Sequence, residues 1–499
     1  MRRTLTALAL LALGALACSL GSAAPSGATP TGSADVFATG AAATLTALPA
    51  GTSAAPTLTP PPAPSNTPFV PPSNTPASTS ATEGAQPATA APATQAATTA
   101  APAATPAAAT GCTLAYTDQA SLFCLPESGT PQSLATGAGL FGPALSPDGA
   151  LIAYQVAITD GVSQLWIAAT TEGGPAPHVL VGQDQLPSAD GSQINSPNHY
   201  QWLAGTHTLA FDTRYIPTAG PGGPGEYINA DLWTVDADSG TLKNLLPAKQ
   251  AGTFAASPNG HTLAVSRPTG LDLLDADGSH RHQDVISYLA VVTYAEYAYK
   301  PAVQWSADGS YFTVGIPTQD PTAPNSAITF YHIGTDGTVE RLGDHPGNYV
   351  FGGNIPPQFA PDGAHVVYSV ADPASKQEAL HMLSIQSDAL GDNAFDTQAS
   401  PTGWGWSPDS QVYAYADVPG NGGGMLYATG PGVEQPHVFA DHLAGLAGLR
   451  WAGGAQVVFL AQMDGGDWGL FKQTTGGDPA AVQKLVGGLN AQSSFDVRP

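Results

Sequence analysis

From residue 111 onward the chain alternates short apolar runs with tight polar turns, a pattern typical of β-strands joined by hairpins. One turn recurs, with Pro to preset φ, Asp or Asn to hydrogen-bond locally and Gly to allow positive φ. An apolar strand follows each copy. The copies are Ser146–Gly149 before Leu151–Tyr154, Ser257–Gly260 before Thr262–Val265, Ser306–Gly309 before Tyr311–Val314, Ala360–Gly363 before His365–Tyr368, Ser407–Ser410 before Val412–Tyr415, and the weaker Leu203–Thr206 and Trp451–Gly454.

The copies repeat about every 50 residues, which is the period of a four-stranded β-propeller blade. A second pair of strands follows in each unit, for example Leu232–Val235, which leads into the turn Asp236–Gly240. These motifs resemble the TolB-like propeller repeats, also called WD40-like or PD40 repeats, over residues 145–487. The resemblance implies an all-β propeller fold and interactions between envelope proteins. It assigns no single role, because this scaffold hosts many.

The blade count depends on the two ends of the repeat region. Three strands without an opening turn are predicted at Leu114–Thr117, Leu122–Leu125 and Gln132–Ala135, and Ser493–Val497 resembles an isolated first strand. Pairing these segments in one blade would close the ring and hide two sheet edges. The sequence therefore predicts eight blades of about 49 residues each, or seven if one weak copy is not a blade.

The N-terminus is typical of an export signal. Arg2 and Arg3 precede the apolar run Leu5–Leu16, which is too short to span a bilayer. Ala15–Ala17 then precede Cys18, which resembles the lipobox of bacterial lipoproteins, although Ala15 stands where that family prefers Leu. The same residues also satisfy the rule for ordinary secretion. We expect a signal peptide over residues 1–17, with lipidation at Cys18 and an anchored protein at the cell envelope or surface, or alternatively a secreted one.

Residues 18–110 are almost entirely Ala, Thr, Pro, Ser and Gly. Such a segment lacks the large apolar side chains that offset ordering entropy, so the sequence predicts a disordered tether before a propeller at 111–499. Cys112 and Cys124 flank the turn at Thr117–Ala120 and would lie roughly opposite each other in a hairpin. The prediction is a disulfide, since export permits one; the alternative is two separate buried thiols.

Charge excludes one class of partner. The chain has 38 acidic and 14 basic residues, a net charge of −24, and no basic residue between Arg3 and Arg214. Nucleic acid is not an expected partner, because phosphate binding needs a surface rich in Lys and Arg. We expect a monomer.

The sequence shows no catalytic motif. It has no G-x-S-x-G nucleophile elbow, no H-E-x-x-H and no P-loop. Asp275–Gly278 and His280–His282 lie close together, but the position of Asp275–Gly278 in its unit favours a hairpin turn over a metal site. We expect no metal and no cofactor.

The longer insertions share one rim by strand counting, and this rim carries the candidate binding residues. The insertions are Gln183–Tyr200, Thr213–Ala230, Tyr288–Pro301, Pro317–Ser326, Gly343–Pro357 and Gln386–Gly403. Their candidate residues are Tyr200, Arg214, Tyr215, Tyr227, Tyr294, Tyr297, Tyr299, Lys300, Tyr349 and Asn354. Tyrosine supplies contact area with a polar tip, and the cations could anchor a carboxylate. The alternative is that these aromatics only pack the loops together.

The sequence thus favours an exported, non-catalytic module that binds a protein or glycan ligand of the cell envelope. The alternative is an extracytoplasmic carbohydrate-active hydrolase or lyase with its site at the channel mouth. A cluster of carboxylates and a histidine at the channel would favour the enzyme, whereas an open aromatic rim would favour the binding module.

Overall fold

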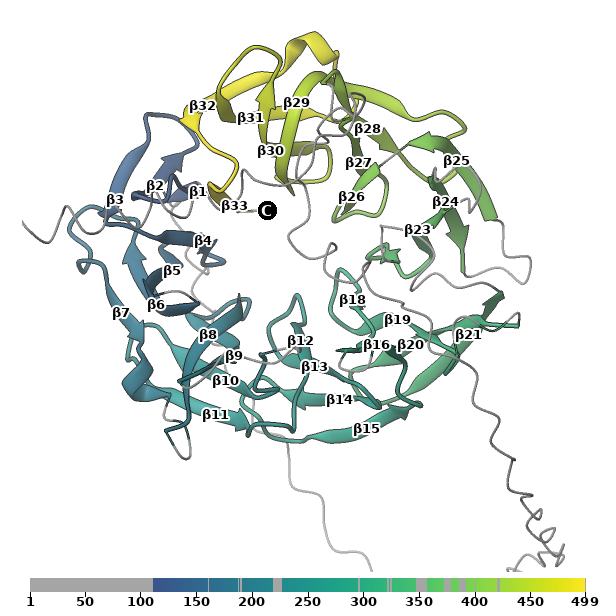
Figure 1. Ribbon diagram of the computed structural model, residues 1–499, viewed down its shortest axis with the longest axis horizontal. Helices are drawn as coiled ribbons and strands as arrows, with labels where there is room; N and C mark the ends of the chain where they lie inside the picture. The colour runs from purple at the N-terminus through teal and green to yellow at the C-terminus, as the bar shows by residue number, and fades with distance from the viewer. Residues whose placement is uncertain are drawn as a thin grey trace, which may run out of the picture. The chain divides into compact units, whose positions relative to one another are not determined.

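The computed structural model describes residues 111–498 except 160, 187, 189–190, 219–226, 295–296, 321–322, 324, 347–356, 372–377, 386–391, 400 and 420–421. This region is an all-β propeller whose sheets stand around a central axis (Figure 1). The Cys18 prediction lies outside the described residues. No helix in the described ranges is long and apolar enough to cross a membrane.

Eight four-stranded blades occur within the described residues, so the eight-bladed prediction is confirmed and the seven-bladed alternative is wrong. Blade 1 contains β4 (Leu140–Leu145), β5 (Leu151–Thr159), β6 (Val162–Ala169) and β7 (His178–Val181). Blade 2 contains β8 (Gln193–Trp202), β9 (Thr208–Pro217), β10 (Leu232–Asp236) and β11 (Leu242–Leu246). Blade 3 contains β12 (Thr253–Ala256), β13 (Thr262–Arg267), β14 (Gly270–Asp275) and β15 (His282–Ser287). Blade 4 contains β18 (Val303–Trp305), β19 (Tyr311–Pro317), β20 (Ala327–Gly334) and β21 (Val339–Pro346).

Blade 5 contains β22 (Gln358–Phe359), β23 (His365–Ala371), β24 (Glu378–Ser384) and β25 (Asp392–Ala399). Blades 6 and 7 share one long strand, β29 (His437–Trp451), which pairs β28 with its first half and β30 with its second. The other strands of these two blades are β26 (Pro401–Trp406), β27 (Tyr413–Asp417), β28 (Gly424–Thr429), β30 (Gln456–Met463), β31 (Trp468–Thr474) and β32 (Gln483–Leu489). A small hairpin of β16 (Val292–Tyr294) and β17 (Tyr297–Ala298) precedes blade 4, and η1 (Gln183–Gln185) and η2 (Pro479–Ala481) are single 3₁₀ turns.

The last blade joins the two ends of the described chain, as the sequence predicts. It contains β33 (Ser494–Val497), β1 (Cys112–Thr117), β2 (Ser121–Pro126) and β3 (Gln132–Thr136), in the order β3-β2-β1-β33. We call it the closing blade. Its inner strand β33 pairs antiparallel with β1, and Figure 1 shows it beside both β4 and the strands of blade 7. The ring therefore closes through main-chain hydrogen bonds.

The recurring turn is held by a buried serine. Ser146 Oγ donates to Asp148 Oδ1 (2.6 Å) and accepts the main-chain N–H of Leu151 (2.9 Å). Ser257, Ser306 and Ser407 make the equivalent bonds in blades 3, 4 and 6. Each serine hydroxyl accepts a main-chain N–H at the start of the second strand that would otherwise have no hydrogen-bond partner. This explains why the same residue types recur in these turns.

Tryptophans that precede these turns connect neighbouring blades. The indole N–H of Trp202 donates to the carbonyl of Ala144 (3.0 Å), that of Trp305 to Ala255 (3.1 Å) and that of Trp406 to Gln358 (2.9 Å). In each case the acceptor belongs to the inner strand of the preceding blade. The core consequently lies between blades. One cluster, for example, joins Leu165 and Ile167 of blade 1 to Leu209 and Phe211 of blade 2.

Cys112 and Cys124 are joined by a disulfide with a Cα–Cα distance of 5.5 Å. They are not directly opposite, which corrects the expected register. Cys112 pairs with Pro126, and Cys124 pairs with Ala115. A bulge between Cys112 and Leu114 shifts the register and brings the two cysteines together diagonally.

Antiparallel topology gives the ring two different faces. The turns between first and second strands, and between third and fourth strands, lie on one side, which we call the turn face. The connections between second and third strands, and between blades, lie on the other side, which we call the loop face.

Candidate functional site

Blade 2 brings three of the predicted rim residues to the loop face. Tyr215 lies near the end of β9, and Tyr227 lies in the connection between β9 and β10. Their rings meet edge to face with centroids 5.6 Å apart, and Tyr215 N–H donates to the Tyr227 carbonyl (2.8 Å). Arg214 precedes Tyr215 on the same strand, so the two side chains point to opposite faces of the sheet. Arg214 therefore faces blade 1, away from the tyrosine pair.

Tyr200 is not a rim residue, which corrects the sequence prediction. Its hydroxyl donates to the carbonyl of Gly142 on β4, and its ring packs against the core between blades 1 and 2. Burial raises its pKa. The predicted insertion Gln183–Tyr200 is shorter than expected because its second half is the inner strand β8. The insertion Gln386–Gly403 is also shorter than predicted, since the range contains β25 and the start of β26.

The β16–β17 hairpin carries Tyr294 and Tyr297, whose Cα atoms are register partners across it. Tyr299 and Lys300 follow the hairpin and line a cavity of about 150 Å³ with Gly315, Ile328 and Phe359. Burial raises the pKa of Tyr299 to about 12. Tyr299 and Lys300 are thus half-buried between blades 4 and 5. Tyr349 and Asn354 lie outside the described residues.

Exposed apolar side chains gather on the loop face. Ten large apolar residues among the described ones are exposed. Seven of these lie at strand ends or connections of the loop face: Phe141, Ile158, Ile194, Tyr227, Leu289, Val370 and Met425. The other three, Val179, Val339 and Val433, lie toward the turn face. The largest exposed fractions, 64% for Leu289 and 47% for Ile158, are both on the loop face.

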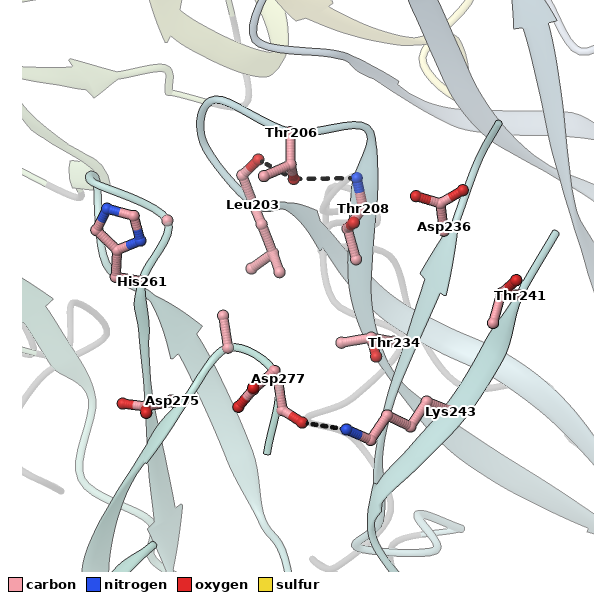
Figure 2. Close-up of a pocket in the computed structure, with 12 residues that line it drawn as sticks. Leu203, Thr206, Thr208, Thr234, Asp236, Thr241, Lys243, His261, Asp275 and Asp277 are labelled. Atoms are coloured by element: carbon pink, nitrogen blue, oxygen red, sulfur yellow. Dashed lines mark hydrogen bonds between the residues drawn. The ribbon is translucent and has the colours of Figure 1, made fainter. Parts of the chain in front are cut away.

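The turn face carries a cavity of about 600 Å³ between blades 2 and 3, which the sequence did not indicate (Figure 2). Its lining residues come from hairpin turns and strand ends: Leu203, Thr206, Thr208, Thr234, Asp236, Thr241, Lys243, Gly260, His261, Asp275, Ala276 and Asp277. Lys243 on β11 reaches across and donates to the carbonyl of Asp277 (2.5 Å), as Figure 2 shows. The Asp275–Gly278 turn predicted from the sequence forms one wall. The sequence therefore indicated the turn but not the cavity beside it.

A second cavity of about 310 Å³ lies between the turns of blades 1 and 2, and His207 of the β8–β9 turn lines it. His207 hydrogen-bonds to Asp148 of blade 1 (3.1 Å) and to Asp238 of its own blade (3.0 Å). Partial burial lowers the pKa of His207, but the two carboxylates outweigh it and raise the net value. Burial likewise acts against ionisation of Asp148, but hydrogen bonds from Ser146, Ala150 and His207 lower its pKa to about 2. His207 thus couples the turns of blades 1 and 2 electrostatically.

Two buried carboxylates lie in blade 2. Asp212 on β9 accepts the main-chain N–H of His199 (2.8 Å) and the side chain of Asn198 (3.1 Å). Asp231 accepts from Thr213 and from the indole of Trp233. Burial raises both pKa values, that of Asp212 to about 6. In the part of the chain that the structure describes, no three His, Cys, Asp or Glu side chains are placed to hold a metal ion.

Asp212 should make the stability of the fold depend on pH. Its pKa is raised in the folded state, so the unfolded chain ionises first and stability falls as pH rises from about 4 to about 6. We expect Asp212→Asn, which keeps an acceptor oxygen, to gain about 1–2 kcal/mol at pH 7.5. The gain should shrink toward zero near pH 4.5. Urea denaturation at the two pH values measures it, and an equal difference at both would contradict the assignment.

Comparisons with known proteins agree with the fold alone. No family model and no curated protein matches the chain. Among solved structures, an oligogalacturonate lyase in complex with manganese is 15% identical and covers 60% of this chain and 79% of its own, with a TM-score of 0.41. Prolyl oligopeptidase B from Galerina marginata is 12% identical over 70% and 52%, with a TM-score of 0.44. TolB from Acinetobacter baumannii is 13% identical over 62% and 72%, with a TM-score of 0.30. Likenesses of this size say nothing about activity.

Proposed function

We propose that this chain is an exported, lipid-anchored β-propeller that acts as a non-catalytic binding module of the cell envelope. The loop face is its contact surface, and the observation that supports this is the gathering of seven of the ten exposed large apolar side chains there. Large apolar side chains left exposed on one face are available for contact with a partner. Most of these side chains are aliphatic, and so they favour a protein partner over a glycan, whose hydroxyls need polar groups.

The anchor is proposed from Arg2, Arg3, the apolar run and Cys18. The segment 18–110 would act as the tether that holds the propeller away from the membrane. A Cys18→Ser chain should move from the membrane fraction to the soluble fraction. Retention in the membrane fraction would contradict lipidation at this residue.

The loop-face proposal is tested by capture with the full chain from an envelope extract of the source cells, followed by measurement of Kd with the identified partner. The variants Ile158→Asp and Leu289→Asp alter the loop face, and Val433→Asp is the matched control because Val433 is 41% exposed on the turn face. We expect at least a tenfold weaker Kd for one or both loop-face variants and an unchanged value for the control. Binding lost only in the control, or unaffected in all three, would overturn the proposal.

A second candidate is an extracytoplasmic carbohydrate-active enzyme. The observation that favours it is the pair of buried carboxylates, Asp212 and Asp231, whose pKa values are both raised. Polysaccharide turnover by the chain that disappears in Asp212→Asn would support this candidate against the binding module. Unchanged turnover in that variant would show that the activity does not need the carboxylate of Asp212.

A further inference from the structure

Blade 2 has a threonine at a position where the two neighbouring blades have a large apolar residue. In blades 1 and 3 an alanine of the second strand pairs with Ile167 and with Leu273, and both of these side chains are buried in the apolar core next to the following blade. The equivalent alanine of blade 2, Ala210, packs against blade 3 and pairs with Thr234. Thr234 is 6% exposed, and its hydroxyl makes no hydrogen bond within the described residues. The contact between blades 2 and 3 therefore lacks the apolar side chain that fills this position in the contacts on either side of it.

The cavity of about 600 Å³ between blades 2 and 3 lies at this position, and Thr234 lines it (Figure 2). Two contacts between the blades bound the cavity. A Cβ on Gly260 of blade 3 would lie 2.3 Å from the carbonyl oxygen of Ala204 in blade 2. Lys243 of blade 2 donates to the carbonyl of Asp277 in blade 3 (2.5 Å). The volume between these contacts lies within the range of small-molecule sites, roughly 300–1,000 Å³.

The cavity opens to solvent on the turn face. Thr206, Thr241 and His261 at its edge are exposed, whereas Thr208 is half-buried and Thr234 is buried. The hydroxyl of Thr208, like that of Thr234, makes no hydrogen bond within the described part of the chain. A molecule that enters from the turn face therefore reaches two hydroxyl groups that have no partner among the described residues.

Charged side chains at the edge add acceptors and one donor group. Asp236 accepts hydrogen bonds from the hydroxyl and the main chain of Ser239 (both 2.7 Å), and these lower its pKa. Ser279 N–H donates to Asp277 (2.8 Å), and the contacts with Ser279 lower the pKa of Asp277. Both carboxylates are therefore ionised at neutral pH and still have acceptor positions for a ligand. The ammonium group of Lys243 keeps two further protons after its hydrogen bond to the Asp277 carbonyl.

We propose that this cavity, which we call the turn-face pocket, binds a neutral saccharide. The pocket presents carboxylate acceptors, ammonium donors and threonine hydroxyls that can do either. A sugar hydroxyl is both a donor and an acceptor, so one kind of ligand group can pair with all of them. The methyl groups of the threonines and the side chain of Leu203 offer apolar contact to the C–H groups of a sugar ring.

Charged ligands match this set of groups less well. An anion such as phosphate or the carboxylate of a uronic acid would lie beside the carboxylates of Asp236, Asp275 and Asp277, in a chain of net charge −24. An organic cation such as a guanidinium offers only donors and would leave the protons of Lys243 without an acceptor. The inference concerns the turn face and therefore goes beyond the loop-face function proposed above.

The test titrates the full chain, by calorimetry, with disaccharides of similar size and different charge. The neutral probes are maltose, cellobiose, lactose and N,N′-diacetylchitobiose, the anionic probe is digalacturonate, and the cationic probe is chitobiose with free amines. We expect at least one neutral disaccharide to bind, and to bind at least tenfold more tightly than either charged probe. Absence of binding to all four neutral probes, or tighter binding of a charged probe, would overturn the inference.

Thr234→Ile gives blade 2 the residue that blade 1 has at this position, Ile167. We expect it to weaken saccharide binding at least tenfold, because it fills the pocket and removes the hydroxyl. The urea midpoint of unfolding should not fall, since isoleucine suits a strand and fills the same position in blade 1. Thr234→Val keeps the shape of the side chain and should weaken binding through loss of the hydroxyl alone. Unchanged binding in Thr234→Ile would place the saccharide elsewhere and overturn the inference.

A matched pair of aspartates separates the pocket from the general charge of the turn face. Asp236 and Asp336 both lie at a turn between third and fourth strands, and Asp336 in blade 4 accepts the N–H of Thr338 (2.9 Å). Asp236→Asn should weaken saccharide binding at least tenfold, and Asp336→Asn should leave it unchanged. An equal loss in both variants would show that overall charge, and not the pocket, controls binding.

The turn-face inference and the loop-face proposal can fail separately. Ile158→Asp and Leu289→Asp should leave saccharide binding unchanged, and Thr234→Ile should leave capture of the protein partner unchanged. If no saccharide binds while a loop-face variant still weakens capture, the turn-face inference is wrong and the loop-face proposal stands. If saccharide binding is lost in Thr234→Ile while no loop-face variant affects capture, the reverse holds.

Discussion

Replacing Phe495 with alanine is expected to destabilise the whole propeller by about 3–5 kcal/mol, the range for truncating a buried phenylalanine. Phe495 is 8% exposed in β33, the strand that closes the ring. It packs with Leu114 and Tyr116 of the closing blade and with Val458 and Leu470 of blade 7. Loss of this packing weakens the contact between the two ends of the chain.

The matched control is Phe141→Ala on the neighbouring inner strand β4, where the side chain is 36% exposed. We expect this control to change stability by no more than about 0.5 kcal/mol, as most surface substitutions do. Guanidinium denaturation of both variants measures the difference, and faster proteolysis of Phe495→Ala would report an opened ring. A loss below about 1 kcal/mol for Phe495→Ala would show that the closing blade is not part of the cooperative unit.

The second large effect is expected at Asp272, which is fully buried in β14 between two arginines. Its carboxylate binds Arg267 (2.7 Å) and Arg281 (2.5 Å) and accepts the N–H of Asp284 (2.9 Å). Asp272→Asn leaves the partly buried guanidinium of Arg281 without its counter-charge and leaves Arg267 only the more exposed carboxylate of Asp284. Breaking such a pair typically costs about 3–5 kcal/mol. Asp344→Asn breaks the exposed pair with Arg341 and should cost less than about 1 kcal/mol.

The Asp272 effect has a defined pH dependence. Burial opposes ionisation of this carboxyl, but the two guanidinium groups and the Asp284 N–H outweigh burial and lower its pKa. A carboxyl with a lowered pKa stabilises the fold above its unfolded value of about 3.9, and this contribution is lost as pH falls through the folded value. The stability difference between wild type and Asp272→Asn should therefore be full at pH 7 and decline below about pH 4. A difference that stays constant down to pH 3 would contradict the ion-pair assignment.

The candidate site could be predicted only in part. Counting strands placed Arg214, Tyr215 and Tyr227 on the loop face, because strand direction reverses at each turn. Strand counting did not show that the side chains of Arg214 and Tyr215 face different neighbouring blades. It also did not show that Tyr200 is a joint between blades, since that depends on β8 lying beside Gly142 of β4.

By itself, the sequence determined the architecture of this protein. The serine-containing turn at Ser146–Gly149 and its copies encode the strand order locally, because each turn satisfies its own hydrogen bonds within a few residues. The isolated strand predicted at Ser493–Val497 indicated ring closure, because an unpaired strand edge needs a partner.

What only the tertiary structure decided is what forms between blades. Register, the bulges that shift it and the rotation between blades decide the partners of Asp272, the close approach of Arg214 to Gly161 and the cavity next to Lys243. The Cys112–Cys124 pair shows the same limit on a small scale, since the register of β1 and β2 makes it diagonal where the sequence predicted the two cysteines to lie roughly opposite each other. Local turn chemistry fixes which strands form, but contacts between distant segments appear only when the blades are packed.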